Sequence, residues 1–210
     1  NKTDNELLAK DLGFALGPRL NAAGRLEDMS IGIRCLLASS LEEGLQYANQ
    51  LEGFNDRRKY LERTAIDSII KKIKPENKSG LVLYNQSWHE GVIGLIASRI
   101  KEEFNLPVIA LTDGCSDKIK GSARSVKGVH IRDLLVNINN NNPDLIESFG
   151  GHAMAAGLTI SKKNIQLFQE KFDDELNLLL SGVSLSNELA YDLTIPNSHI
   201  TLNFAYEINH

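Results

Sequence analysis

The segment "KGSARS" at positions 120–125 carries residue types suited to binding an anion. Lys120, Ser122 and Arg124 alternate along it, with Gly121 among them. On a β-strand, Ser122 and Arg124 would point to the same face, because successive side chains alternate between the two faces. A hydroxyl beside a guanidinium forms a good phosphate clamp, since Arg can donate two parallel hydrogen bonds to an anion. The alternative is an edge strand whose polar residues face water.

The segment "SFGGHAMAAG" at positions 148–157 places one imidazole among very small residues. Gly150 and Gly151 precede His152, and small residues follow it up to Gly157. Exposed backbone of this kind allows another molecule to come close. We therefore expect His152 at the floor of a groove, where it could donate a hydrogen bond to a phosphate oxygen. A lone histidine is more often structural.

The segment "GPRLNAAGRL" at positions 17–26 has a similar composition. Arg19, Asn21 and Arg25 lie among glycines and alanines that would let a ligand or another segment approach. The alternative is a helix junction held by arginine salt bridges. The dipeptide Gly17-Pro18 is expected to break any helix at that point.

Trp88 and His89 lie in "SWHEGVIG" at a predicted turn from strand to helix, where free N–H groups favour anions. We expect Trp88 to lie in the core instead of forming a platform for base stacking. His89 alone is weak evidence for an anion site.

No metal site is predicted from this sequence. The five histidines are widely separated, and HxH, HExxH and DHH are absent. Hydrolysis at a two-metal site needs several carboxylates and histidines that converge on the ions. The nucleophile motif GxSxG is also absent. Cys35 and Cys115 form no CxxC pair, which indicates two reduced thiols.

The composition is that of a globular protein with one or two domains. The chain has 210 residues, of which 42% are hydrophobic, and a formal net charge of −4. This charge argues against a general binder of polyanions but allows a local basic site. No apolar run approaches the ~18 residues that a membrane span requires. The first residue is Asn1 and no signal peptide follows, so we expect a piece of a longer protein.

A long helix is predicted over residues 41–74, where apolar residues recur every three or four positions. Ser40 and Glu43 fit the capping-box pattern at its start. A single helix of this length would span about 50 Å and act as a strut between two lobes. The alternative is two shorter helices broken near Gly53.

The following region predicts an α/β fold. Residues 80–84, 107–111, 118–125 and 156–160 are strand-like, and residues 89–104, 129–138 and 162–180 are helical. The first strand, helix and second strand form a βαβ unit with parallel strands. We therefore expect a mixed, partly parallel sheet flanked by helices and preceded by the long helix.

Four segments, which occur in a fixed order, resemble the later motifs of the RecJ-type single-strand-specific exonucleases. They are "GPRLNAAGRL", "SWHEGVIGLIASRI", "KGSARS" and "SFGGHAMAAGLTI". The motif "GGHAMAAG" is typical of the wider DHH phosphoesterase superfamily and its DHH-associated domain. The first two segments narrow the resemblance to the RecJ branch, and the similarity covers roughly residues 12–180.

This resemblance implies a bacterial 5′-to-3′ exonuclease acting on single-stranded DNA in repair and recombination, with Mn²⁺ or Mg²⁺. The family's metal ligands lie in an N-terminal DHH domain whose motifs this sequence lacks, so the chain alone should be inactive. The implied division is the end of the catalytic side with the hinge (1–39), the connecting helix (40–75), the DHH-associated domain (76–182), and a linker with the start of an incomplete segment (183–210) that leads into an OB-fold.

The resemblance also implies roles for individual residues. Ser122 and Arg124 match the family's phosphate-binding strand, and His152, preceded by Gly150 and Gly151, matches its histidine beside the scissile bond. The residues that match the motif facing the cleft from the hinge side are Arg19, Asn21 and Arg25.

The implied partner is single-stranded DNA, with single-strand-binding protein and a helicase reached through other domains. We expect a cytoplasmic monomer without a membrane partner. Two alternatives remain at this point: a fragment of a DHH-family oligoribonuclease or cyclic-dinucleotide phosphodiesterase, and a non-enzymatic nucleic-acid-binding domain.

Overall fold

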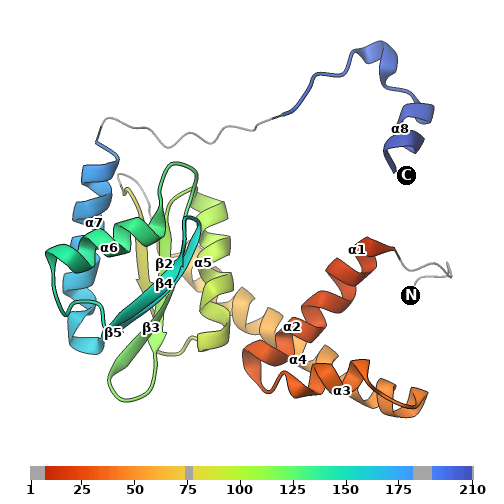
Figure 1. Cartoon of the computed structure of the whole chain (residues 1–210), viewed down its shortest axis with the longest axis horizontal. Helices are drawn as coiled ribbons and strands as arrows, with labels where there is room; N and C mark the ends of the chain where they lie inside the picture. The colour runs from red at the N-terminus through yellow and green to blue at the C-terminus, as the bar shows by residue number, and fades with distance from the viewer. Residues whose placement is uncertain (1–7, 74–77, 182–190, 210) are drawn as a thin grey trace.

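The computed structural model describes residues 8–73, 78–181 and 191–209 (Figure 1). The expected domain boundaries at 75/76 and 182/183 lie outside these ranges. None of the described helices is both long enough and apolar enough to cross a membrane.

The first described segment is helical almost throughout. It contains α1 (Ala9–Asp11), the π-helix η1 (Leu12–Leu16), α2 (Gly17–Leu26) and α3 (Ser30–Leu36). The expectation that Gly17-Pro18 would break the helix is wrong, because α2 begins at Gly17 and Pro18 lies in its first turn. Leu16 has α-helical backbone angles and the Gly17 N–H donates to the Leu12 carbonyl, so the chain passes from η1 into α2 without a break.

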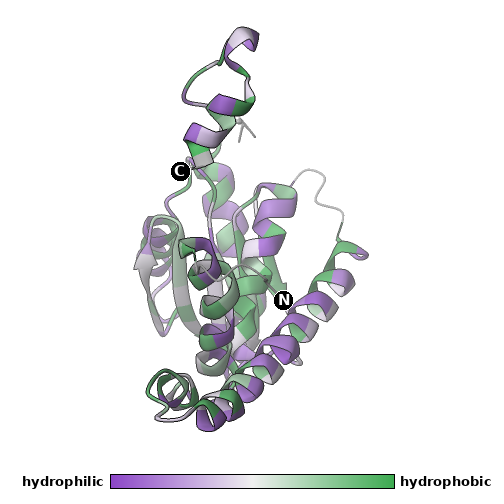
Figure 2. Cartoon of the chain, turned by 90° about the vertical axis from the view of Figure 1, so that its right-hand side faces the viewer, coloured by the Kyte–Doolittle hydropathy of each residue, from purple (hydrophilic) through white to green (hydrophobic). Residues whose placement is uncertain are grey.

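The long helix α4 (Leu41–Ile70) is one uninterrupted helix, so the alternative break near Gly53 is wrong. The Ser40 hydroxyl accepts a hydrogen bond from the Glu43 N–H at 3.2 Å and caps its first turn. The Glu43 carboxylate accepts from the N–H of Ser39 at 3.0 Å, one residue earlier than a capping box requires. Figure 2 shows a largely hydrophilic outward surface along this helix.

The remaining elements build a five-stranded sheet with helices on both faces, which confirms the predicted fold class. Its strand order is β1-β2-β3-β5-β4; β1 and β2 are parallel and the other pairs are antiparallel. The strands are β1 (Leu81–Tyr84), β2 (Val108–Asp113), β3 (Lys118–Arg124), β4 (Ser148–His152) and β5 (Ala155–Ser161). The helices are α5 (Glu90–Phe104), α6 (Ile131–Asn141), α7 (Ile165–Leu179) and, near the end of the chain, α8 (Leu202–Asn209), with 3₁₀ turns η2 (Lys162–Asn164) and η3 (Asn197–His199).

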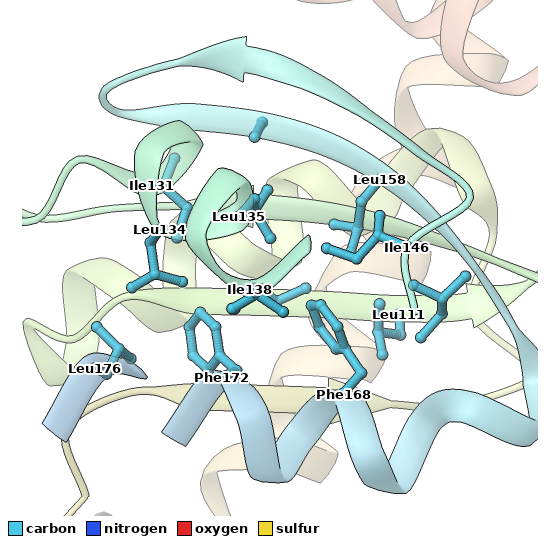
Figure 3. Packing of buried hydrophobic residues seen from close by; sticks show 14 of the residues in the cluster. Leu111, Ile131, Leu134, Leu135, Ile138, Ile146, Leu158, Phe168, Phe172 and Leu176 are labelled. Carbon is cyan, nitrogen blue, oxygen red and sulfur yellow. The ribbon is translucent and has the colours of Figure 1, made fainter. Parts of the chain in front are cut away.

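One face of the sheet is closed by α6 and α7 and forms the main core. Phe168, Phe172 and Leu176 point from α7 into this core and are fully buried (Figure 3). The two phenylalanine rings stack with centroids 6.4 Å apart. Burial of such side chains stabilises the fold by about 1.5–3 kcal/mol each.

The other face is only partly covered. Helix α5 packs on β2 and β3, and α4 packs behind it through Ala65 and Ile69. On the strands beyond, Gly157 of β5 and Gly150 of β4 are exposed. The half of this face over β5 and β4 is therefore open, and it borders the polar side of β3.

Candidate nucleic-acid phosphate site

A groove of about 430 Å³ lies between α2, the first turns of α5, and the strands β3 and β5. Its floor and walls come from segments that are far apart in the sequence. It is lined by Gly24, Arg25, Glu90, Gly91, Ile93, Gly94, Lys120, Gly121, Ser122, Gly157, Leu158 and Thr159.

Ser122 and Arg124 lie side by side on β3, as the strand alternation predicts. The Arg124 guanidinium donates from Nη1 to the Ser122 hydroxyl at 3.1 Å and to the Ala123 carbonyl at 2.8 Å. Helix α5 comes close to this pair at Gly94, where a Cβ atom would lie 3.0 Å from Arg124 Nη2 and 3.1 Å from Ser122 Oγ. A glycine at this position therefore leaves the guanidinium its space.

The electrostatics of the groove favour an anion. Burial lowers the pKa of Arg124 from its ordinary value, and the nearby charge of Arg25 lowers it further. In the part of the chain that the structure describes, no ion pair joins Arg25, Lys120 or Arg124 to a carboxylate. Partly buried cations without counter-ions are costly, and a bound anion would remove part of that cost.

Gly150 and His152 lie on the edge strand β4, on the same side of the sheet as the clamp. Gly150 pairs with Gly157, which pairs with Ser122. In the next row, His152 pairs with Ala155, which pairs with Arg124. The backbones of His152 and Arg124 are thus two strand spacings apart, or about 10 Å. A phosphate-bearing chain lying across β5 could contact both side chains.

The imidazole of His152 is oriented by the turn that follows it. Its Nδ1 accepts a hydrogen bond from the Met154 N–H at 3.3 Å. In the neutral ring the proton is then on Nε2, which leaves this nitrogen as a donor toward a ligand. The strand β4 was not predicted from the sequence, and the pairing with β5 is what makes it a strand.

Different structural requirements explain the glycines around His152. At Gly150 an added Cβ would meet nothing within 4 Å, and at Gly157 only the Gly121 carbonyl at 4.0 Å. At Gly151 the backbone has φ of +150°, and a Cβ would lie 2.3 Å from the Ala155 carbonyl. Gly151 is therefore required by the fold, whereas the absence of side chains at Gly150 and Gly157 leaves the sheet surface open to a ligand.

The three candidate residues of α2 lie in different surroundings. Arg25 lines the groove, and its Nη1 lies 3.4 Å from the Gly91 carbonyl. Arg19 forms a salt bridge with Glu52 of α4 and donates to the Ala15 carbonyl at 2.7 Å. Asn21 is exposed and is not among the residues that line the groove. The structure thus brings Arg25, but not Arg19 or Asn21, to the clamp.

The turn before α5 has a structural function. His89 is the N-cap of α5, and its Nδ1 accepts from the Gly91 N–H at 3.1 Å. Trp88 packs against the core cluster around α5, as expected. Gly91 allows α2 to cross closely, since a Cβ there would lie 1.8 Å from the Arg25 carbonyl.

Lys120 and Thr159 are among the groove residues that were missed as site candidates. Lys120 belongs to the same alternation that singled out Ser122 and Arg124, so that pattern could have identified it. Thr159 faces Lys120 across the β3–β5 pairing, and no sequence signal marks it.

The residues that the structure describes do not offer a site for a divalent metal. Within the described ranges, no group of three or more His, Cys, Asp or Glu side chains could hold an ion. The groove is lined by two basic residues, Arg25 and Lys120, and one acidic residue, Glu90. Its excess of positive charge suits a phosphate better than a metal ion.

Comparisons with known proteins agree with the motifs. The DHHA1 domain family matches residues 77–178. The chain is 41% identical to the single-stranded-DNA-specific exonuclease RecJ of Salmonella typhimurium, over 98% of this chain and 37% of that protein. It is 42% identical to that of Haemophilus influenzae over the same shares. The chain therefore spans little more than a third of the length of these relatives.

Solved structures of RecJ exonucleases are also similar to this chain. RecJ from Thermus thermophilus in complex with Mg²⁺ matches with a TM-score of 0.71 and 28% identity, over 80% of this chain and 26% of that one. A RecJ exonuclease bound to manganese also matches with a TM-score of 0.71 and 28% identity, over 85% of this chain and 44% of that one. The long helix, the sheet and the sequence motifs together show that the chain belongs to the RecJ family, of which it represents a segment containing the DHHA1 domain.

Proposed function

We propose that this chain is the substrate-binding portion of a 5′-to-3′ exonuclease that acts on single-stranded DNA. The observation that carries this proposal is the open groove lined by Arg25, Lys120 and Ser122, with Arg124 bonded to Ser122 beside it. The groove also holds one carboxylate residue, Glu90, but no described ion pair joins it to these cations. Phosphate is the charged group that every nucleotide presents, and Arg clamps suit its geometry. The RecJ relatives are named single-stranded-DNA-specific exonucleases, which agrees with the substrate and the reaction but does not give the direction of digestion.

Ser122 and Arg124 hold a substrate phosphate in this proposal. Arg124 supplies charge-assisted hydrogen bonds, and the Ser122 hydroxyl fixes the orientation of the guanidinium. Arg25 adds positive charge from the opposite wall, while Gly150 and Gly157 let the DNA backbone approach the sheet. His152 donates from Nε2 to a phosphate oxygen, where its contribution grows as negative charge develops during hydrolysis. Arg19 and Asn21 would act on the hinge side of the cleft.

The divalent ions would be held by residues outside this chain, on a DHH domain that faces the groove. We propose Mn²⁺ or Mg²⁺, since RecJ structures contain one or the other. We further propose that the full-length protein acts as a cytoplasmic monomer in DNA repair and recombination, and that other domains contact single-strand-binding protein and a helicase.

The experiment that tests this proposal compares the full-length protein with the isolated chain. Both are incubated with 5′-labelled single-stranded DNA and Mn²⁺. We expect mononucleotide release from the 5′ end by the full-length protein only, and a lower kcat for its His152→Ala variant. Release of nucleotides by the isolated chain would contradict the assignment of the metal ligands. Degradation limited to short oligoribonucleotides or cyclic dinucleotides would favour the other branch of the superfamily.

A further inference from the structure

Lys120 differs from its neighbouring lysines in its choice of partner. Lys118 pairs with Glu147 at 2.8 Å, and Lys162 pairs with Asp113 at 2.7 Å. The Lys120 ammonium instead donates to the neutral hydroxyl of Thr159 at 3.3 Å. Of these three lysines, only Lys120 lines the groove.

The position of Lys120 is set by the sheet. Thr159 is its direct cross-strand neighbour in the β3–β5 pairing and is only 6% exposed. Lys120 itself is half-buried, so its ammonium is held over the groove instead of extending into solvent. An ammonium has three donors, and the structure uses one of them on Thr159. The remaining donors are available to an anion in the groove.

The spacing along β3 relates Lys120 to the clamp. Lys120 and Ser122 are two residues apart on one face, which corresponds to about 7 Å. Neighbouring phosphates in an extended single strand are separated by a similar distance. A strand that places one phosphate on Ser122 and Arg124 can therefore place the next one on Lys120.

We propose that Lys120, held by Thr159, forms a second phosphate subsite that binds the phosphate adjacent to the one on Ser122 and Arg124. This inference rests on the proposed function and adds the requirement that the groove engages two successive phosphates. The subsite contacts the backbone and not the bases, so it is insensitive to sequence. It favours oligonucleotides over mononucleotides, which carry one phosphate.

The test measures binding of 5′-phosphorylated oligothymidylates to the full-length protein, without divalent ions so that no turnover occurs. In each oligonucleotide one phosphate in turn is replaced by a neutral methylphosphonate. Three variants are compared with the unchanged protein: Lys120→Gln, Arg124→Gln, and Lys118→Gln as the matched control on the same strand. Thermal melts verify folding, and Lys120→Arg serves as a variant that retains the charge.

We expect Lys120→Gln to weaken oligonucleotide binding by roughly tenfold, the size of one charge-assisted contact. Replacing the phosphate that contacts Lys120 with a methylphosphonate should weaken binding to the unchanged protein by a similar factor. The same replacement should not weaken binding to Lys120→Gln any further, because the contact is already lost in that variant. Thymidine monophosphate should bind both proteins equally, and Lys118→Gln should change affinity less than about twofold. Lys120→Arg should keep most of the affinity.

Two failures can be distinguished. If Arg124→Gln weakens binding while Lys120→Gln behaves like Lys118→Gln, the second subsite is wrong and the proposed function stands. The second subsite is also wrong if Lys120→Gln lowers the affinity by the same factor for every methylphosphonate oligonucleotide. That result would indicate only a diffuse effect of charge. If neither Arg124→Gln nor Lys120→Gln changes binding, the proposed function itself is contradicted.

Discussion

Strands β3 and β5 present one face to the core beneath α6 and α7 and the other to the groove, and glycine occurs on both. On the core side, a Cβ at Gly121 would lie 2.6 Å from Leu158 Cδ2 and 2.7 Å from Leu111 Cδ2. On the groove side, Gly157 of β5 and its cross-strand neighbour Gly150 on β4 have open space above them. Packing inside the chain explains the first glycine, whereas no contact within the described residues explains the other two, and we propose that they leave room for a ligand.

The charges divide in a similar way. At the end of the sheet, Asp113 forms a salt bridge with Lys162, and Lys118 forms one with Glu147. In the groove, Lys120 and Arg124 bond to neutral oxygens. The paired charges have their partners within the chain, whereas the cations of the groove are the ones that we propose to bind a substrate phosphate. The predictions below test this division.

The largest effect is expected for Gly121→Ala. The new methyl group would overlap Leu158 and Leu111 in a close-packed core, so the free energy of unfolding should fall by about 1–3 kcal/mol. Urea denaturation of the chain measures this loss. An unchanged midpoint would show that the core adjusts freely and that the packing explanation for this glycine is wrong.

Arg124→Ala should have the opposite profile, with a loss of function and little loss of stability. Removing one charge-assisted contact should lower kcat/KM of the full-length enzyme on single-stranded DNA by roughly 10- to 100-fold. The melting temperature should stay close to that of the unchanged protein, because the guanidinium is half-buried without a counter-ion. Unchanged kcat/KM, or a collapsed melting temperature, would make Arg124 a structural residue.

Much of this arrangement could be predicted where the signal is local. The alternation in "KGSARS" predicted that Ser122 and Arg124 share a face, and their contact at 3.1 Å agrees. Apolar periodicity predicted the long helix, and the order of strand, helix and strand predicted the parallel β1–β2 pair. Both features depend on residues close together in sequence, whose geometry follows from one element or one βαβ unit.

The rest depends on tertiary packing. The strand Ser148–His152 has two glycines and low strand propensity, and it exists because β5 supplies its hydrogen bonds. Arg19 and Arg25 look alike in the sequence, but six helical residues turn them to different sides of α2. One then meets Glu52 and the other meets the groove. Only the position of α2 against α4 and α5 decides between these outcomes.

Gly157→Ala should also impair function without loss of stability, but less strongly than Arg124→Ala. A Cβ at this position has space, and alanine restricts the unfolded chain more than glycine does, so stability should be unchanged or higher by about 0.5–1 kcal/mol. The methyl group would nevertheless rise from the groove floor and hinder the DNA backbone, so affinity should fall several-fold. Fluorescence anisotropy with the full-length protein and urea denaturation of the chain measure the two quantities. Unimpaired binding would show that this glycine is not part of the ligand surface.

The smallest effect concerns the paired charges at the end of the sheet. The hydrogen bond from Lys162, followed by that from the Tyr84 hydroxyl, holds the pKa of Asp113 below its ordinary value. A carboxyl whose pKa is lower in the folded state stabilises the fold above its unfolded pKa of about 4, and this contribution is lost as the pH falls through the folded value. Asp113→Asn should therefore be less stable than the unchanged chain at about pH 6, and the difference should shrink at about pH 3. The pair is exposed, so the effect is small.

Urea midpoints at the two pH values measure this effect, and Lys120→Gln serves as the control. The Lys120 ammonium has no carboxylate partner among the described residues, so the stability of this variant should depend on acid pH in the same way as that of the unchanged chain. A stability difference for Asp113→Asn that stays constant between these pH values would mean that the Asp113–Lys162 pair is not a source of stability.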